Sequence, residues 1–158
     1  MRTVIQRAKD ASVSIEGSVN ACFNGQGLVI LLGIELSDTV EDVAWLVRKI
    51  SNLRIFDDEN GVMNRSILDI DTQTNHREGN IIVVSQFTLF ASYKKGNRPS
   101  WLRAAGHEHA VPLYEAFLKE MADALGKPIG HGEFGANMQV QLTNNGPVTI
   151  IMDTKNKE

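Results

Sequence analysis

The stretch NIIVVSQFTLFA, residues 80–91, decides the fold because an apolar run in it leads directly into polar residues. The run from Ile81 to Val84 consists of β-branched residues and is typical of a strand that is covered on both faces. Ser85, Gln86 and Thr88 then alternate with apolar residues. If the strand continues through them, Gln86 and Thr88 lie on one face and Ser85 on the other. A strand of this kind is expected to end in a pocket.

Other segments with a period of two predict the partners of this strand. Apolar and polar residues alternate over 11–15 and 19–23, which indicates a hairpin with one solvent-exposed face. Residues 27–34, GLVILLGI, are apolar throughout and predict a central strand. Residues 138–143 alternate again, and residues 148–152 form a further strand-like run after a break. Strands are therefore expected to outnumber helices.

Two segments have the spacing of amphipathic helices. From Val40 to Ile50, apolar residues recur three and four positions apart, behind a possible Asp38 cap with Glu41 three residues later. A second helix is expected from Pro112, a favoured first residue, to Leu125. Residues 69–80 are rich in polar side chains and predict a loop or hairpin tip.

Length and composition fit one folded domain over residues 1–158. Hydrophobic residues make up 42% of the chain and charged residues 22%, which is ordinary for a globular protein. The single Cys22 cannot form a disulfide within the chain. The apolar run from Leu28 to Ile34 is too short to cross a membrane, and the opening residues lack the pattern of a signal peptide. We therefore expect one α+β domain that is soluble, cytoplasmic and not associated with a membrane.

The familiar catalytic and metal-binding patterns are weak. Cys22 lies in an alternating strand, where a packed side chain is a better interpretation than a nucleophile. His107 and His109 occur without further ligands at suitable spacing, so a solvated loop is expected there and not a zinc site. The sequence ties neither His76 nor His131 to the polar residues of the buried strand as a general base. A GQG segment precedes a strand, which is the wrong context for a phosphate-binding loop. We expect no metal and no cofactor.

A turn signal lies in TNNGPVTI, residues 143–150. Pro147 cannot donate to a strand ladder, and Gly146 permits backbone angles that are closed to other residues. A plain turn between two strands is the simplest interpretation. A cis peptide is also possible, since the trans preference before proline is only about 0.5–1 kcal/mol. A rigid cis turn would direct backbone carbonyls that can accept hydrogen bonds from an ammonium group.

A basic segment runs from Ser92 to His107 and contains no acidic residue. The net charge of −3 gives no general attraction to nucleic acid, so local charge matters more and no DNA binding is expected. A solvated loop and a phosphate-contacting surface are both consistent with the pattern. The cations are Lys94, Lys95, Arg98 and Arg103, with Tyr93 and Trp101 between them.

Several motifs, in order along nearly the whole chain, carry a resemblance to a known family. They are VIQRAKDASV (4–13), NLRIF (52–56), SQFTLF (85–90), KGNRPSW (95–101), FGANMQV (134–140) and NNGPVT (144–149). Through these motifs the sequence resembles the D-aminoacyl-tRNA deacylase family, whose members are also called D-tyrosyl-tRNA deacylases. The resemblance implies the fold of that family, a strand-rich, barrel-like sheet with two main helices.

The resemblance also implies a function. Members of the family are homodimers that hydrolyse the ester between a D-amino acid and the 3′ acceptor end of tRNA, and glycine should be accepted too. The turn at Gly146 and Pro147, flanked by Asn144 and Thr149, is expected to enter the active site of the partner and to exclude L-amino acids. Arg7 matches a residue that supports this turn, although a surface position is equally plausible from the sequence alone.

The same resemblance assigns the catalytic region to Ser85, Gln86, Phe87 and Thr88. A backbone N–H near Phe87 is expected to stabilise the oxyanion, an interaction worth about 3 kcal/mol in other enzymes. No base is evident beside Thr88, so we expect it to position the substrate, while a ribose hydroxyl of the tRNA assists the reaction. The four cations of the basic segment are expected to contact phosphates of the acceptor stem.

Two other functions stay open at this point. A non-catalytic nucleic-acid-binding protein with the same fold would use the basic segment and leave the pocket idle. Retention of the SQFT and NNGP motifs argues against it. An ordinary hydrolase of small esters or peptides would need a Ser or Thr nucleophile with a placed histidine and acid, for which the sequence offers no pattern.

Overall fold

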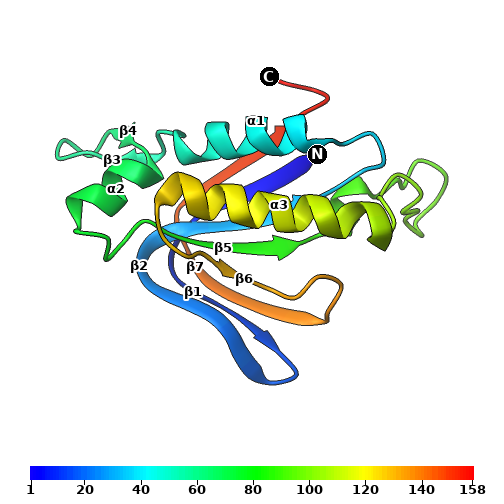
Figure 1. Ribbon diagram of the computed structural model, residues 1–158, viewed down its shortest axis with the longest axis horizontal. Helices are drawn as coiled ribbons and strands as arrows, with labels where there is room; N and C mark the ends of the chain where they lie inside the picture. Colours follow the sequence, from blue (N-terminus) through cyan, green and yellow to red (C-terminus); the bar gives the residue numbers. More distant parts are fainter.

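Five strands form one curved sheet in the computed structural model, which describes residues 1–158 (Figure 1). They are β1 (Arg2–Ile15), β2 (Ser18–Gly33), β5 (Asn80–Ser85), β6 (Gly130–His131) and β7 (Met138–Asp153). Their order across the sheet is β6-β5-β2-β1-β7. β5 runs parallel to β2 and β6, whereas β1 is antiparallel to both of its neighbours. The predicted α+β class with a strand-rich, curved sheet is confirmed.

The curvature is concentrated in the two long strands β1 and β2. Their pairing shifts register between Lys9 and Ala11. Asp10, the residue between them, has φ 56°, and its carboxylate accepts a hydrogen bond from the Gly25 N–H at 2.7 Å. One extra residue on a strand bends it and increases its twist. The predicted hairpin and the predicted central strand are therefore parts of one bent ribbon.

Two long helices, α1 (Val40–Ser51) and α3 (His107–Leu125), lie side by side on one face of the sheet (Figure 1). α3 buries the apolar stripe that the sequence predicts. α1 buries Val43, Val47 and Ile50 of its predicted stripe but leaves Val40 and Ala44 exposed. α3 begins before Pro112, which was the predicted first residue. Its first turn stays helical because Ala110 is buried and its N–H bonds to the carbonyl of Gly106 at 3.0 Å.

The start of α1 also differs from the prediction. Thr39 is the N-cap, and Asp42 completes a capping box with it. Asp38, the predicted cap, is buried, and its carboxylate pairs with the amino group of Met1. A buried carboxylate needs a charged or hydrogen-bonding partner. A contact distant in sequence supplies that partner here.

A short helix, α2 (Ile67–Gln73), and a small sheet of β3 (Phe56–Asp57) and β4 (Met63–Arg65) form one end of the molecule (Figure 1). The prediction of a polar loop over residues 69–80 is therefore wrong for its first residues, which belong to α2. Ser66 caps α2, and the two isoleucines of α2 are buried in the core. A helix of seven residues is too short to show a clear period among so many polar side chains.

The predicted extension of β5 into the polar residues does not form. β5 ends at Ser85, and a 3₁₀ helix, η1 (Phe87–Phe90), follows it. The N–H of Gln86 still bonds to the carbonyl of Leu32 at 2.7 Å, but β2 itself ends one residue later. A Cβ on Gly33 would lie only 3.0 Å from the Gln86 carbonyl oxygen. The chain turns there because the neighbouring strand ends and its last residue is small.

Apolar side chains form two clusters on opposite faces of the sheet. The larger cluster joins Ile5, Ile30 and Val83 of the strands to Phe117 of α3. The smaller one includes Val29 of the central strand, with half-buried residues of β7 packed against it. None of the helices combines the length and apolar character that crossing a bilayer requires.

Candidate active site

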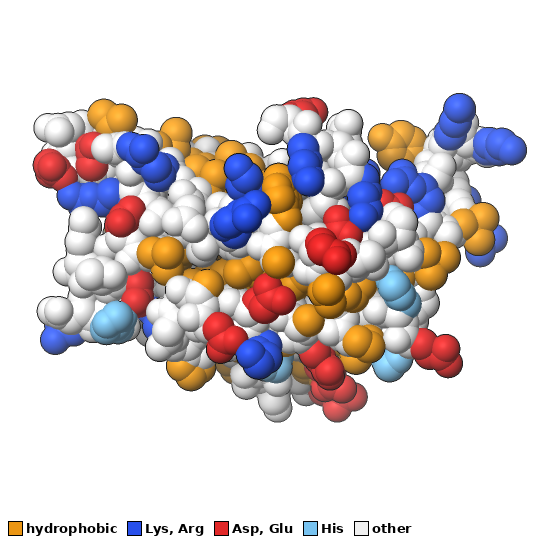
Figure 2. Space-filling view, turned by 45° about the horizontal axis from the view of Figure 1, so that its top comes forward, with side chains coloured by type: hydrophobic (Ala, Val, Ile, Leu, Met, Phe, Trp, Pro, Cys, Tyr) orange, Lys and Arg blue, Asp and Glu red, His pale blue; other side chains and the backbone are white.

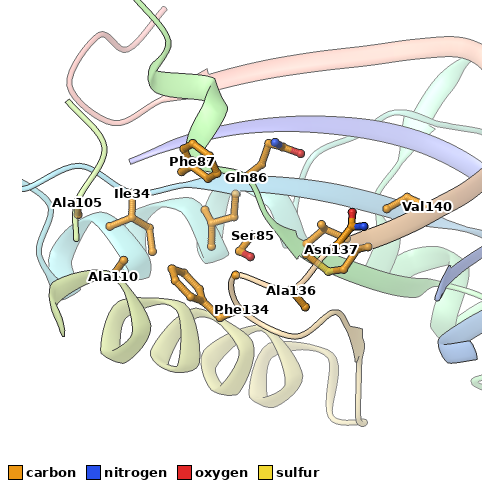
Figure 3. A pocket seen from close by; sticks show the side chains of 14 residues that line it. Ile34, Ser85, Gln86, Phe87, Ala105, Ala110, Phe134, Ala136, Asn137 and Val140 are labelled. Atoms are coloured by element: carbon orange, nitrogen blue, oxygen red, sulfur yellow. The ribbon is translucent and has the colours of Figure 1, made fainter. Parts of the chain in front are cut away.

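A pocket of about 260 Å³ opens where β5 ends (Figure 3). In this view the rings of Phe87 and Phe134 lie on either side of it, with Ser85 between them. The walls come from the ends of β2 and β5, the start of η1, the start of α3 and the loop that leads into β7. The lining residues are Leu32, Ile34, Val84, Ser85, Gln86, Phe87, Ala105, Ala110, Phe134, Gly135, Ala136, Asn137, Met138 and Val140.

The lining is mostly apolar and carries no charge. Ten of its 14 residues are hydrophobic, and its polar side chains are those of Ser85, Gln86 and Asn137. None of these side chains ionises near neutral pH. A lining of this kind suits a planar or apolar group that a few hydrogen bonds orient. Acid–base chemistry in the pocket therefore depends on the substrate or on groups outside the lining.

Three of the four predicted catalytic residues, Ser85, Gln86 and Phe87, meet at the pocket, whereas Thr88 does not line it. Thr88 is half-buried in η1, and its Oγ1 accepts a hydrogen bond from the side-chain amide of Gln86. No ionisable side chain forms a hydrogen bond with Thr88. A hydroxyl nucleophile needs an adjacent base, and this geometry supplies none.

The histidines of α3 do not provide a base either. His107 and His109 lie in the first turn of the helix, so the predicted solvated loop is wrong. The His107 ring packs edge-on against Phe134 with centroids 5.5 Å apart, and His109 Nε2 lies 3.0 Å from the carbonyl of Asp38. No three His, Cys, Asp or Glu side chains converge in a geometry that could hold a metal ion.

Tyr114 of α3 fixes the strand that leads to the pocket. Its hydroxyl donates a hydrogen bond to the carbonyl of Val83 at 3.1 Å. Burial raises the pKa of Tyr114 well above its ordinary value. The phenol therefore stays protonated and acts as a structural donor.

The Gly146–Pro147 turn is exposed and lies within β7. Gln6 pairs with Thr149 and Ala8 pairs with Asn144, so the residues between Asn144 and Thr149 bulge out opposite a single residue of β1. The Gly146–Pro147 peptide bond is cis. The predicted break between two strands is thus a bulge inside one long strand.

Arg7 lies beneath this turn and is only 6% exposed. Its Nε donates to the carbonyl of Asn145 at 2.9 Å, and its NH1 donates to the carbonyl of Ile55 at 2.7 Å. NH1 also lies 3.0 Å from Oδ1 of Asp57. The buried side chain excludes the surface position that the sequence left open.

Three residues without a role in the sequence analysis belong to these sites. The Oε1 of Gln6 accepts hydrogen bonds from Nδ2 of Asn144 at 2.9 Å and from Oγ1 of Thr149 at 2.6 Å. It therefore joins both ends of the bulge. Phe134 and Asn137 line the pocket. Gln6 lies in the VIQRAKDASV motif, and Phe134 and Asn137 lie in the FGANMQV motif. Membership of these motifs was the signal in the sequence that could have identified the three residues.

The turn and the pocket are separate within one chain. The N-terminal part of β7 contributes Met138 and Val140 to the pocket, but neither Gly146 nor Pro147 lines it. β7 is an edge strand of the sheet. The turn is therefore exposed to solvent or to another molecule.

The basic segment projects from one end of the molecule between η1 and α3 (Figure 1), and lysine and arginine side chains gather there (Figure 2). Lys94, Lys95 and Arg98 are exposed and form no ion pair. Arg103 differs, because its NH2 lies 3.2 Å from Oε2 of Glu35. Three of the four cations that were predicted to contact phosphate are thus free, and the fourth already forms an ion pair.

Comparison with known proteins identifies the family of this chain. The family model described as D-Tyr-tRNA(Tyr) deacylase matches residues 4–153. The D-aminoacyl-tRNA deacylases of Phocaeicola vulgatus and Bacteroides thetaiotaomicron are each 60% identical over 158 residues, which is 100% of both chains.

Two solved structures superpose on nearly the whole chain. The c-Myc DNA Unwinding Element Binding Protein is 39% identical, with a TM-score of 0.86 over 98% of this chain and 99% of the other. A probable eukaryotic D-amino acid tRNA deacylase is 16% identical, with a TM-score of 0.75 over 96% and 97%, and shares the fold.

The family model and the full-length relatives show that this chain, with its curved sheet, paired helices and uncharged pocket, is an enzyme of the deacylase class. The match over nearly all of the sequence shows that the chain belongs to the D-Tyr-tRNA(Tyr) deacylase family.

Proposed function

We propose that this enzyme hydrolyses the ester between a D-amino acid and the 3′ end of tRNA, releasing free tRNA and the amino acid. The observation that carries the proposal is the uncharged pocket, where Ser85, Gln86 and Phe87 meet at the end of β5. Its apolar walls suit the terminal base of the tRNA, and its few polar groups can orient the acyl end. The exposed basic segment beside η1 suits the tRNA phosphates that lie next to this terminal base.

The proposed hydrolysis depends on the substrate more than on a protein base. An ester is more reactive than an amide, and the neighbouring ribose hydroxyl can assist. The first hydrogen bond of η1 runs from the Leu89 N–H to the Gln86 carbonyl at 3.3 Å, so the N–H groups of Phe87 and Thr88 have no partner within η1. We assign the Phe87 N–H to the developing oxyanion, where such a donor is worth about 3 kcal/mol.

Thr88 has a positioning role in this proposal. Its hydroxyl already accepts the Gln86 amide and lies outside the pocket lining. Thr88→Ala is therefore expected to slow deacylation without abolishing it. Mass spectrometry of the quenched wild-type reaction tests this. An acyl group trapped on the wild type, together with an inactive Thr88→Ala, would make Thr88 the nucleophile.

Selection of D- over L-amino acids is proposed to come from the Gly146–Pro147 turn of a second copy in a homodimer. Three observations support this. The turn is exposed, Arg7 fixes it from beneath, and it does not line the pocket of its own chain. The carbonyls of the turn would accept hydrogen bonds from the α-amino group. An L side chain would then meet backbone, whereas a D side chain would point to solvent and glycine would be accepted.

One assay tests the function. The enzyme is incubated with matched D- and L-tyrosyl-tRNA and with a free D-tyrosine ester. We expect deacylation of D-tyrosyl-tRNA alone. Equal cleavage of the free ester and both tRNAs would indicate an ordinary esterase.

Nucleic-acid binding without catalysis is the second candidate. The free cations Lys94, Lys95 and Arg98 favour it, as does the 39% identical structure named for binding a DNA unwinding element. It predicts tight binding of tRNA or duplex DNA with no turnover of any aminoacyl-tRNA. Measured turnover of D-tyrosyl-tRNA would exclude it as the whole function.

A further inference from the structure

Two arginines from distant parts of the chain lie over the same ring at the end of η1. The guanidinium carbon of Arg2 is 4.9 Å from the centroid of the Phe90 ring, and that of Arg103 is 5.4 Å from it. Phe90 is 1% exposed. Arginine over a desolvated aromatic face is a favourable contact. Two cation–π contacts to the Phe90 ring, together with the burial of that ring, therefore fix the end of η1.

Arg2 also binds the backbone of η1. Its NH1 donates to the carbonyl of Leu89 at 2.7 Å. Its Nε and NH2 donate to Oδ2 of Asp153 at 3.0 and 2.7 Å. Asp153 neutralises this guanidinium and connects η1 to the end of β7.

Arg103 connects η1 to the base of the basic segment. Its NH2 lies 3.2 Å from Glu35, which neutralises the second guanidinium. Glu35 forms a bridge with Ala104, and the Ala105 N–H bonds to the carbonyl of Ile34 at 2.9 Å. The segment is thus anchored to the end of β2 directly beside Arg103.

The basic segment touches η1 at its other end too. Trp101 packs edge-on against Phe87, with ring centroids 5.4 Å apart. Phe87 lines the pocket and is the first residue of η1, and Phe90 is the last. Two residues of the basic segment therefore contact the first and last residues of η1.

We propose that Arg2 and Arg103 are positioning residues that fix η1 against the pocket, and that Arg103 acts through Phe90 instead of contacting tRNA phosphate. This inference rests on the proposed deacylase function. It separates Arg103 from Lys94, Lys95 and Arg98, which form no ion pair. Residues that fix η1 affect every substrate of the pocket, whereas phosphate contacts affect only substrates that carry phosphates.

The test compares D-tyrosyl-tRNA with 3′-O-D-tyrosyl adenosine, which has no phosphate. We expect Arg103→Ala to lower kcat by about tenfold or more on both substrates, since small displacements of catalytic groups have effects of this size. Arg98→Ala should instead raise KM for the tRNA far more than it affects the nucleoside. Arg65→Ala, which removes an arginine–glutamate pair at the end of β4, is the matched control and should equal the wild type.

Arg103→Lys decides between the two roles. Lysine keeps the positive charge but lacks the planar group that stacks on a ring. It should therefore lower kcat on both substrates, by less than Arg103→Ala, if Arg103 positions η1, and behave like the wild type if Arg103 binds phosphate. Arg2→Lys should lower kcat on both substrates as well. A wild-type rate for Arg103→Lys on both substrates, or an effect of Arg103→Ala on tRNA alone, would overturn the inference.

The proposed function and the positioning inference are tested by different results. If the wild type does not deacylate D-tyrosyl-tRNA, the proposed function fails. If the wild type is active and the folded Arg103→Ala variant matches it on the nucleoside, only the positioning inference fails. Circular dichroism and thermal unfolding of each variant establish that it is folded.

Discussion

The Nε of Arg7 donates a hydrogen bond to the carbonyl of Asn145 at 2.9 Å, across 138 residues of sequence. The same buried guanidinium bonds to the carbonyl of Ile55 at 2.7 Å. The Gly146–Pro147 turn is therefore tied through one charge to the segment that follows α1. An exposed turn becomes a fixed feature of the surface in this way.

Arg7→Lys should loosen the turn without removing the charge. One ammonium group cannot reproduce the fork that reaches both carbonyls. We expect the free energy of unfolding to fall by about 1–3 kcal/mol, measured in urea, because a buried carbonyl loses its donor. The ratio of D- to L-tyrosyl-tRNA deacylation rates should fall too. Arg54→Lys is the control, since Arg54 is exposed and donates to the carbonyl of Asn64. An unchanged rate ratio in a folded Arg7→Lys variant would contradict the role of the turn.

Gln6→Ala should affect selectivity more than stability. The lost acceptor joins Asn144 to Thr149 in an exposed setting, so we expect a loss of about 1 kcal/mol or less in unfolding free energy. The ratio of D to L rates should decrease. Gln6→Glu retains an acceptor oxygen at this position and should restore most of the ratio of D to L rates. Equal selectivity in Gln6→Ala and the wild type would show that the bulge needs no such link.

Gly33→Ala should displace η1. The added Cβ would lie 3.0 Å from the Gln86 carbonyl oxygen and 3.1 Å from the Leu89 Cβ. We expect kcat on D-tyrosyl-tRNA to fall on the order of tenfold, with a smaller change in KM. Gly106→Ala is the control, because a Cβ there meets no atom within 4 Å. A normal kcat for Gly33→Ala would mean that η1 tolerates the displacement.

Binding of tRNA should weaken steeply as salt is raised. Each phosphate contact contributes about one unit to the slope of log K against log salt concentration. We expect Lys94→Ala, Lys95→Ala and Arg98→Ala each to reduce the slope by about one, measured by fluorescence anisotropy with labelled tRNA. Lys119→Ala, on the exposed face of α3, should leave it unchanged. A flat salt response of the wild type would remove the basic segment from the interface.

Stability should fall in acid partly through Asp42. Burial opposes its ionisation, but hydrogen bonds from Lys155, Thr154 and Thr39 outweigh burial and lower the pKa of Asp42 to about 2. A lowered pKa stabilises the fold fully above the unfolded value of about 3.9, and this contribution is lost as pH falls through about 2. Asp42→Asn should therefore lose less stability than the wild type between about pH 4 and pH 2. Urea midpoints that change equally in both proteins would contradict this.

The sequence alone determined the elements whose side chains repeat with a clear period. The strand at 81–84, the apolar run at 27–34 and the two long helices follow from local patterns, since burial on one or both faces requires those patterns. The sequence also determined the family, because the motifs that carry it are short, specific and ordered along the whole chain.

The tertiary structure alone decided how the site is assembled. β5 ends at Ser85 because β2 ends beside it and Gly33 lets η1 approach, which no pattern within 80–91 could reveal. Arg7 is buried because backbone carbonyls more than 40 residues away in sequence accept hydrogen bonds from its guanidinium. Arg103 is paired with Glu35 although its sequence neighbours suggest a free cation. In each case the partner is distant in sequence, and local propensity contains no information about it.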